Sequence, residues 1–151
     1  MILPTISSKQ LETEPWLLWN AFISGISCDP KELAAEQRAA ALVFGYDSEV
    51  QNGGHLQYFE NRGTTHLEET IAALGELGAY GQQSVLKEAA EAFLSSPHKR
   101  VAGPEEYLAA ALEDQFGAFD VCFHACSPSL QVILERLLDK HRSNFVRLDK
   151  P

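Results

Sequence analysis

Residues 49–63 crowd two glycines, carboxamides, carboxylates, a histidine and aromatic side chains into one short stretch. If the chain folds back at the glycines, Glu49, His55 and Gln57 have the side chains for a general base and for polar ligand contacts. They suggest a small-ligand or hydrolytic site, although their spacing matches neither His-Glu-x-x-His nor a catalytic triad signature. The structural alternative is that Glu49 or Asn52 accepts the free amide hydrogens of a helix that begins after the glycines.

The Gly53-Gly54 pair lacks the preceding strand and the following lysine that mark a phosphate-binding loop, so we expect no nucleotide site there. Two glycines inside a continuous helix would cost about 2 kcal/mol relative to alanine. The sequence therefore predicts a break or a sharp kink at this pair. Gly63 has the position of a C-terminal helix stop.

Cys122, His124 and Cys126 form a second cluster with metal-ligating side chains. On one helix, positions 122 and 126 share a face while position 124 points about 200° away, so the three cannot converge on one ion. No fourth ligand stands nearby in the sequence. We expect buried thiols on an apolar helix face, and no bound metal or cofactor.

Glu106, Glu113 and Asp120 are spaced seven residues apart, with Glu105 and Asp114 beside them. On a continuous helix this row places a carboxylate about every 10 Å, which is roughly commensurate with three phosphate steps along a DNA strand. Such a row can imitate DNA phosphates. Any solvated helix face has a similar appearance, so the alternative is a plain exposed surface.

The net charge of −9 is unevenly distributed along the 151 residues. Lys and Arg number four against eight Asp and Glu in residues 1–63, three against ten in residues 64–126, and five against three in residues 127–151. The three segments therefore carry −4, −7 and +2. This distribution argues against direct nucleic-acid binding, which needs a cationic face, and allows a basic protein partner.

The apolar runs are too short for a membrane helix, and the N-terminus lacks a basic opening segment and a long apolar run. Three cysteines make a poor disulfide framework, which agrees with a reducing compartment. We expect a cytoplasmic protein without membrane association.

Helical periodicity and helix-capping residues recur along the chain, and strand-type alternation is absent, so the sequence predicts one all-α domain of six or seven helices. Its central helix is the one broken by the glycines. Two close tryptophans in the first helix, Trp16 and Trp19, indicate a core anchor. Predicted helix starts are Pro15, Asp29-Pro30, a capping box at residues 65–68, Pro104 (with a helix to residue 126) and Ser127-Pro128.

The most distinctive motif is Glu49-Val50-Gln51-Asn52-Gly53-Gly54 followed by Gln57, Tyr58, Phe59 and Asn61. It resembles the signature of the bacterial DNA-mimic protein family, whose domain was long catalogued as one of unknown function. The likeness continues through Ala-Leu-Gly-Glu-Leu-Gly-Ala at residues 73–79 and covers residues 30–146 more loosely. The chain departs from the signature at His55, where the family has an aromatic residue.

The resemblance implies an all-helical fold and, for the founding mimic, competition with DNA for a basic transcription factor. We therefore expect a non-catalytic monomer or homodimer that binds a basic DNA-binding protein. The residues expected to contact this partner are Glu105, Glu106, Glu113, Asp114 and Asp120. An immunity protein that neutralises a toxin would present the same kind of surface and differ only in its partner.

Overall fold

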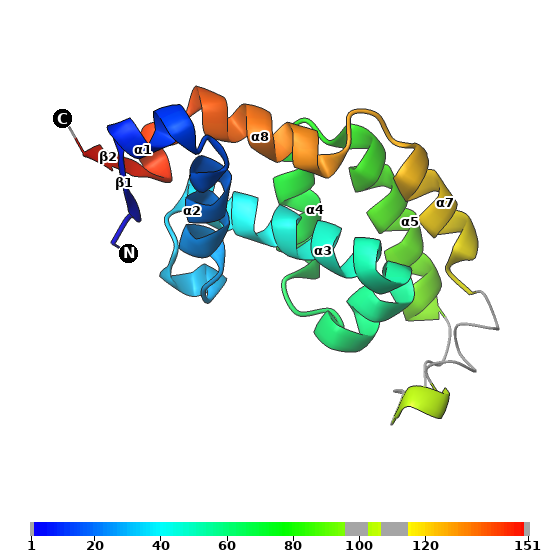
Figure 1. Cartoon of the computed structure of the whole chain (residues 1–151). Helices are drawn as coiled ribbons and strands as arrows, with labels where there is room; N and C mark the ends of the chain where they lie inside the picture. Colours follow the sequence, from blue (N-terminus) through cyan, green and yellow to red (C-terminus); the bar gives the residue numbers. More distant parts are fainter. Residues whose placement is uncertain (1, 96–102, 107–114, 150–151) are drawn as a thin grey trace.

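Helices form nearly all the regular structure of residues 2–95, 103–106 and 115–149, which are the residues that the computed structural model describes (Figure 1). The all-α prediction is confirmed. The α-helices are α1 (Ser8–Thr13), α2 (Trp16–Ile26), α3 (Ala35–Arg62), α4 (Leu67–Glu76), α5 (Tyr80–Ser95), α7 (Gly117–Ala125) and α8 (Leu130–Lys140). Two short 3-10 helices, η1 (Pro30–Glu32) and η2 (Arg142–Asn144), and two strands, β1 (Thr5–Ser7) and β2 (Arg147–Asp149), complete these elements.

Helix α3 lies at the centre of the bundle, as the sequence predicts. It contacts α2, α4, α7 and α8, which together surround it (Figure 1). Two alanines, Ala39 and Ala40, are buried on α3, and their small side chains let neighbouring helices approach closely. The polar motif of residues 49–63 lies in the second half of this helix, so the central helix also positions the candidate site.

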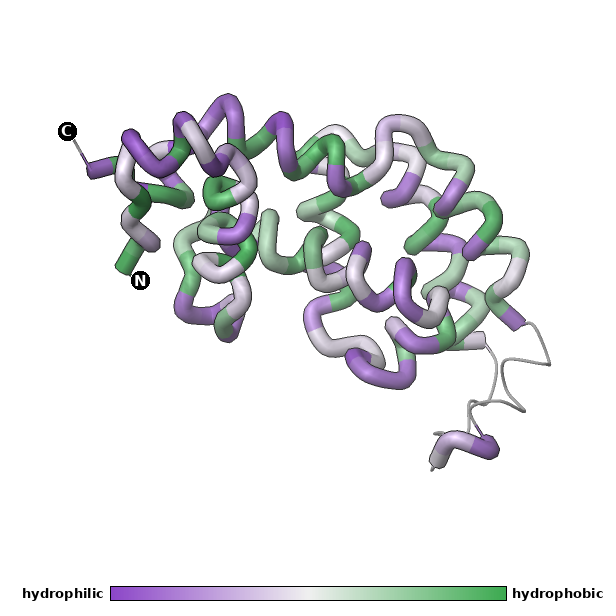
Figure 2. Tube along the Cα trace, viewed as in Figure 1, coloured by the Kyte–Doolittle hydropathy of each residue, from purple (hydrophilic) through white to green (hydrophobic). Residues whose placement is uncertain are grey.

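The core is one continuous cluster of buried apolar side chains that runs from β1 to the C-terminal segment. In α8, the buried residues recur at helical spacing, and Figure 2 shows hydrophobic and hydrophilic residues alternating along this helix. Aromatic rings join distant elements: Phe59 stacks on Phe93 at 4.4 Å between centroids, and Phe22 meets Phe145 edge-on at 5.0 Å. At the C-terminal end of the chain, Phe145 and Val146 fold back onto the core, and both are buried.

Strands β1 and β2 pair in parallel and bring the two ends of the chain together, with Ile6 opposite Leu148 (Figure 1). The Ser8 hydroxyl donates to the Asp149 carbonyl at 2.6 Å and extends this contact. The sequence predicts no strand here. Three residues are too few to show an alternating pattern, and a partner 141 residues away leaves no local signal.

Several predicted helix starts are wrong in detail. The predicted capping box at Thr65 does not form: α4 begins at Leu67 after His66, whose φ is 60°. Residues 63–66 form a turn instead, and the Thr70 hydroxyl donates to the His66 carbonyl at 2.8 Å. In α8 the cap is Ser129, which accepts from the Val132 amide at 3.4 Å, so Ser127 does not cap this helix.

Other helix boundaries also differ from those predicted from the sequence. Asp29 and Pro30 open only η1, and α3 begins at Ala35. The predicted helix from Pro104 to residue 126 is interrupted, because residues 115 and 116 form a turn before α7. Trp16 is 56% exposed, so of the two expected anchors only Trp19 packs against the core. None of the helices in the described ranges is both long and apolar enough to cross a membrane.

Candidate functional site

The predicted break at the glycine pair is confirmed inside α3. Gly53 has φ −151° and ψ 23°, and Gly54 has φ 69° and ψ −172°, so neither is helical. The Gly54 conformation is one that residues with a Cβ rarely adopt. A Cβ atom at this position would also lie 2.5 Å from Asp120 Oδ2. Glycine is therefore needed here both for the backbone conformation and for the approach of α7.

Asp120 of α7 caps the helical segment that follows the glycines. Its Oδ1 accepts from the His55 backbone amide at 2.9 Å and from His55 Nδ1 at 2.6 Å. An amide at a helix start has no partner within its own helix, and Asp120 supplies one from 65 residues away. We expected Glu49 or Asn52 to do this, and that expectation is wrong, because a residue distant in sequence occupies the position.

His55 links Asp120 to Tyr46 in a buried chain of hydrogen bonds. A carboxylate only accepts, so His55 Nδ1 carries the hydrogen, and Nε2 accepts from the Tyr46 hydroxyl at 2.7 Å. The His55 and Tyr46 side chains are fully buried. Both imidazole nitrogens are thus hydrogen-bonded inside the protein and shielded from solvent, so a substrate has no access to His55 in this structure.

Burial and hydrogen bonding shift the pKa values at both ends of this chain in opposite directions. Burial raises the pKa of Tyr46 well above its ordinary value, so its hydroxyl stays protonated and can donate. At Asp120, partial burial acts to raise the pKa. The hydrogen bonds from the His55 side chain and amide outweigh it and lower the pKa. Asp120 is therefore a carboxylate at neutral pH, as a helix cap should be.

Glu49 is the acceptor in a second polar cluster on the other side of the kink. Its carboxylate accepts from Gln57 Nε2 and Asn61 Nδ2, both at 2.8 Å, and pairs with Arg62 Nε at 3.3 Å. Asn52 joins through Gln57, whose Oε1 accepts from Asn52 Nδ2 at 3.0 Å. The Glu49 side chain is only 16% exposed. The polar residues of the motif thus satisfy one another and hold the two halves of α3 together.

The aromatic residues of the motif belong to the core. Tyr58 and Phe59 are buried, and the Tyr58 ring meets Tyr46 edge-on at 5.0 Å between centroids. Phe59 lies against Phe93 and Phe116. These two aromatic residues of the motif therefore stabilise the core. The arrangement around Glu49, His55 and Gln57 supports the structural alternative over a ligand or hydrolytic site, because their polar groups bind one another and their neighbours.

The acidic residues expected to bind a partner fall into three groups. Glu105 and Glu106 are exposed in the helical residues 104–106. Glu113 and Asp114 lie outside the described residues. Asp120 is half-buried and bonded to His55, with 32% of its side chain exposed.

The cysteine cluster does not have the environment we expected. Cys122 is exposed and Cys126 is half-buried, so the prediction of two buried thiols is wrong. Cys126 Sγ donates to the Cys122 carbonyl at 3.2 Å, and burial together with Cys122 raises the pKa of Cys126. Within the described ranges, no group of three or more His, Cys, Asp or Glu side chains gathers as a metal site.

The candidate site expected from the sequence does not include Tyr46. Its hydroxyl completes the chain through His55, nine residues later. The local signal is weak: Tyr46 is a tyrosine with a polar hydroxyl in the helix that precedes the glycine pair. The sequence does not identify His55 as the partner of this hydroxyl, because the angle of the kink determines which side chains come into contact.

Comparisons with known proteins agree with the motif. A family model described as DMP19-like protein matches residues 31–142, which is more than half of the chain. The matched region contains the kink of α3 and the Asp120 cap. No curated protein and no solved structure matches the chain significantly.

Proposed function

This chain belongs to the DMP19-like protein family, and we propose that it acts without catalysis by occupying the DNA-binding surface of a basic protein. A transcription factor in the cytoplasm is the partner that this proposal names. The family is not a known enzyme family. The observation that carries the proposal is the excess of carboxylates in residues 64–126, which contain ten Asp and Glu but three Lys and Arg.

Part of the negative charge of residues 64–126 lies toward one end of the molecule. Helices α5 and α7 and residues 103–106 lie at the end away from the two chain termini (Figure 1). Glu88 and Glu91 are exposed on α5, and Glu105 and Glu106 are exposed in residues 103–106. A basic DNA-binding surface is attracted to such an acidic end, because complementary charges steer association and stabilise the encounter.

The five predicted contact residues are not equivalent in this proposal. Asp120 Oδ1 is hydrogen-bonded to His55, so the main role of Asp120 is to stabilise the fold. A partner could contact only the exposed 32% of its side chain. Glu105 and Glu106 are exposed and are the best positions to test. Glu113 and Asp114 remain candidates from the sequence.

The proposal is tested with basic DNA-binding proteins of the source organism, enriched on heparin and passed over the immobilised chain. We expect a protein to be retained, to be released by added duplex DNA, and to bind more weakly as salt rises. The variant Glu105→Gln/Glu106→Gln should weaken retention. The matched control is Glu12→Gln/Glu32→Gln, which removes two exposed carboxylates near the chain's N-terminus and should leave retention unchanged.

Three results would count against the proposal: no retained protein, retention that salt and DNA do not alter, or equal loss in both double variants. A retained protein that is a toxin and binds no DNA would instead indicate an immunity protein. In that case the acidic surface is used, but DNA does not compete for it.

A further inference from the structure

A cavity of about 810 Å³ lies at the end of the molecule that carries the two termini. It is formed by the segment before β1, the end of α8, η2 and β2, and its lining includes Leu3, Arg142, Arg147 and Leu148. The kink of α3 contributes no residue to this lining. Its location separates this cavity from the acidic end on which the proposed function depends.

The lining is cationic although the protein as a whole is acidic. Lys140, Arg142 and Arg147 line the cavity together with one carboxylate, Asp139. Asp139 lies 3.9 Å from Arg142, and both side chains are well exposed, so this ion pair is weak. A net positive charge of two therefore remains on the lining.

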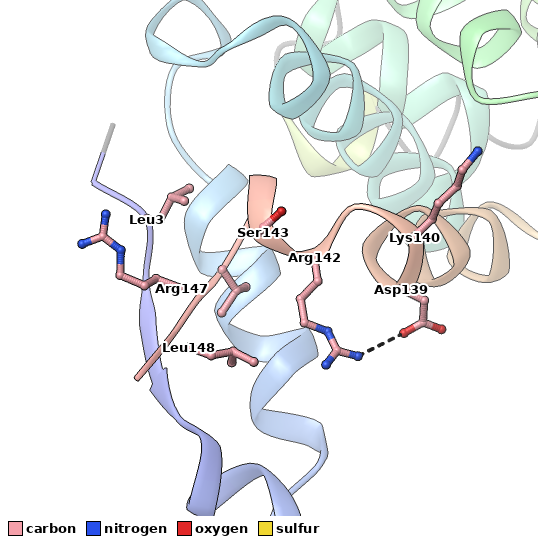
Figure 3. Close-up of a pocket in the computed structure, with 8 residues that line it drawn as sticks. Leu3, Asp139, Lys140, Arg142, Ser143, Arg147 and Leu148 are labelled. Atoms are coloured by element: carbon pink, nitrogen blue, oxygen red, sulfur yellow. Dashed lines mark ion pairs between the residues drawn. The ribbon is translucent and has the colours of Figure 1, made fainter. Parts of the chain in front are cut away.

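The three cations are spread around the cavity and do not converge. Figure 3 shows Arg147 at one side, Lys140 at the other, and Arg142 between them, turned toward Asp139. One phosphate or one carboxylate could not reach all three. A ligand with several separate negative charges along its length can.

The apolar part of the lining and the edge of β2 suit an extended peptide. Leu148 is 37% exposed and lies in the lining with Leu3. The Arg147 amide donates to Pro4 on the β1 side at 2.9 Å. Because successive residues of a strand direct their backbone groups to opposite edges, those of Leu148 face the outer edge of β2. In the described part of the chain, β1 is the one strand paired with β2.

We infer that this cavity and the outer edge of β2 bind an extended acidic peptide segment of a partner protein. The segment adds a strand beside β2, places apolar side chains on Leu3 and Leu148, and sets its carboxylates against Lys140, Arg142 and Arg147. Backbone pairing and alternate side chains are the two sources of affinity in this kind of recognition. Nucleic acid fits less well, because its sugar-phosphate backbone offers no strand pairing to the edge of β2.

The test uses a fluorescent peptide that alternates glutamate with valine, a second peptide with glutamine in place of glutamate, and a short DNA duplex. Fluorescence anisotropy with the full chain should show the glutamate peptide bound more tightly than the other two. The variant Arg142→Gln/Arg147→Gln should weaken this binding about tenfold. The control Lys31→Gln/Lys87→Gln removes two exposed cations elsewhere and should leave the affinity unchanged.

Leu148→Glu is a second variant that keeps the inference falsifiable if the double arginine variant does not fold. It places a negative charge in the lining at an exposed position and should abolish peptide binding. Amide NMR signals of Leu148 and its neighbours should shift on titration with the glutamate peptide. Equal affinity for both peptides, tighter binding of DNA, or signal shifts confined to other elements would overturn the inference.

Discussion

Asp120 Oδ1 lies 2.6 Å from His55 Nδ1 and 2.9 Å from the His55 backbone nitrogen. This one oxygen ties α7 to the start of the helical segment after the glycine pair. It satisfies a helix amide and sets the tautomer of a buried imidazole at the same time. The bend of the central helix and the position of α7 therefore depend on each other.

Asp120→Asn should lower the free energy of unfolding by about 1–2 kcal/mol at neutral pH, because it removes charge-assisted hydrogen bonds at a partly exposed site. Chemical denaturation measures this. Asp139→Asn is the control: its carboxylate is exposed and pairs weakly with Arg142, so the change should stay within about 0.5 kcal/mol.

The loss should depend on pH in a defined direction. The pKa of Asp120 is lowered by folding, so its contribution is present above the ordinary carboxyl pKa of about 4 and is lost as pH falls through the lower folded value. The stability curves of the wild type and Asp120→Asn should therefore converge in acid. A constant difference across that range would contradict the role given to the carboxylate.

Gly54→Ala should destabilise the fold by about 2–4 kcal/mol, because it combines backbone strain with a clash against Asp120. Gly63→Ala is the matched control, since Gly63 also has positive φ, at 53°, with no atom near its would-be Cβ. Its cost should be clearly smaller in thermal and denaturant unfolding. Equal costs would mean that the approach of α7 is not tight.

A double-mutant cycle with Gly54→Ala and Asp120→Asn tests whether these two positions are energetically coupled. Because Gly54→Ala already displaces the Asp120 side chain, adding Asp120→Asn should cost less than it does alone. Additive losses in the cycle would show that the two positions act independently.

Tyr46→Phe should cost about 1–3 kcal/mol, because it leaves the buried His55 Nε2 without a donor while hardly changing the packing. Tyr80→Phe removes the same hydroxyl from a tyrosine that is 68% exposed and should be nearly neutral. The free energies of unfolding of both variants provide the measurement. A neutral Tyr46→Phe would refute the hydrogen-bonded chain.

Glu49→Gln should destabilise the protein by about 1–2 kcal/mol, because the charge that draws Gln57, Asn61 and Arg62 together is lost. Glu88→Gln on the exposed face of α5 is the control for carboxylate loss. Amide hydrogen exchange in the second half of α3 should also speed up in Glu49→Gln only. Unchanged exchange there would argue that Glu49 does not hold the kink.

Local chemistry was sufficient to predict the helical class, the kink and the C-terminal end of α3. Glycine pairs penalise a helix wherever they occur, and Gly63 supplies a positive φ without strain, so both features can be read from neighbouring residues. The inward face of α8 follows for the same reason, since Leu130, Ile133 and Leu134 recur at the helical period.

Only the tertiary structure decided which residues satisfy the kink and where the chain ends meet. Asp120 looked like one carboxylate in an exposed acidic row, yet it caps His55 from 65 residues away. The pairing of β1 with β2 and the cavity beside them likewise depend on segments at opposite ends of the chain. Residue types and spacing determine what each segment prefers locally, whereas the packing of segments against one another determines which distant polar groups come within hydrogen-bonding distance.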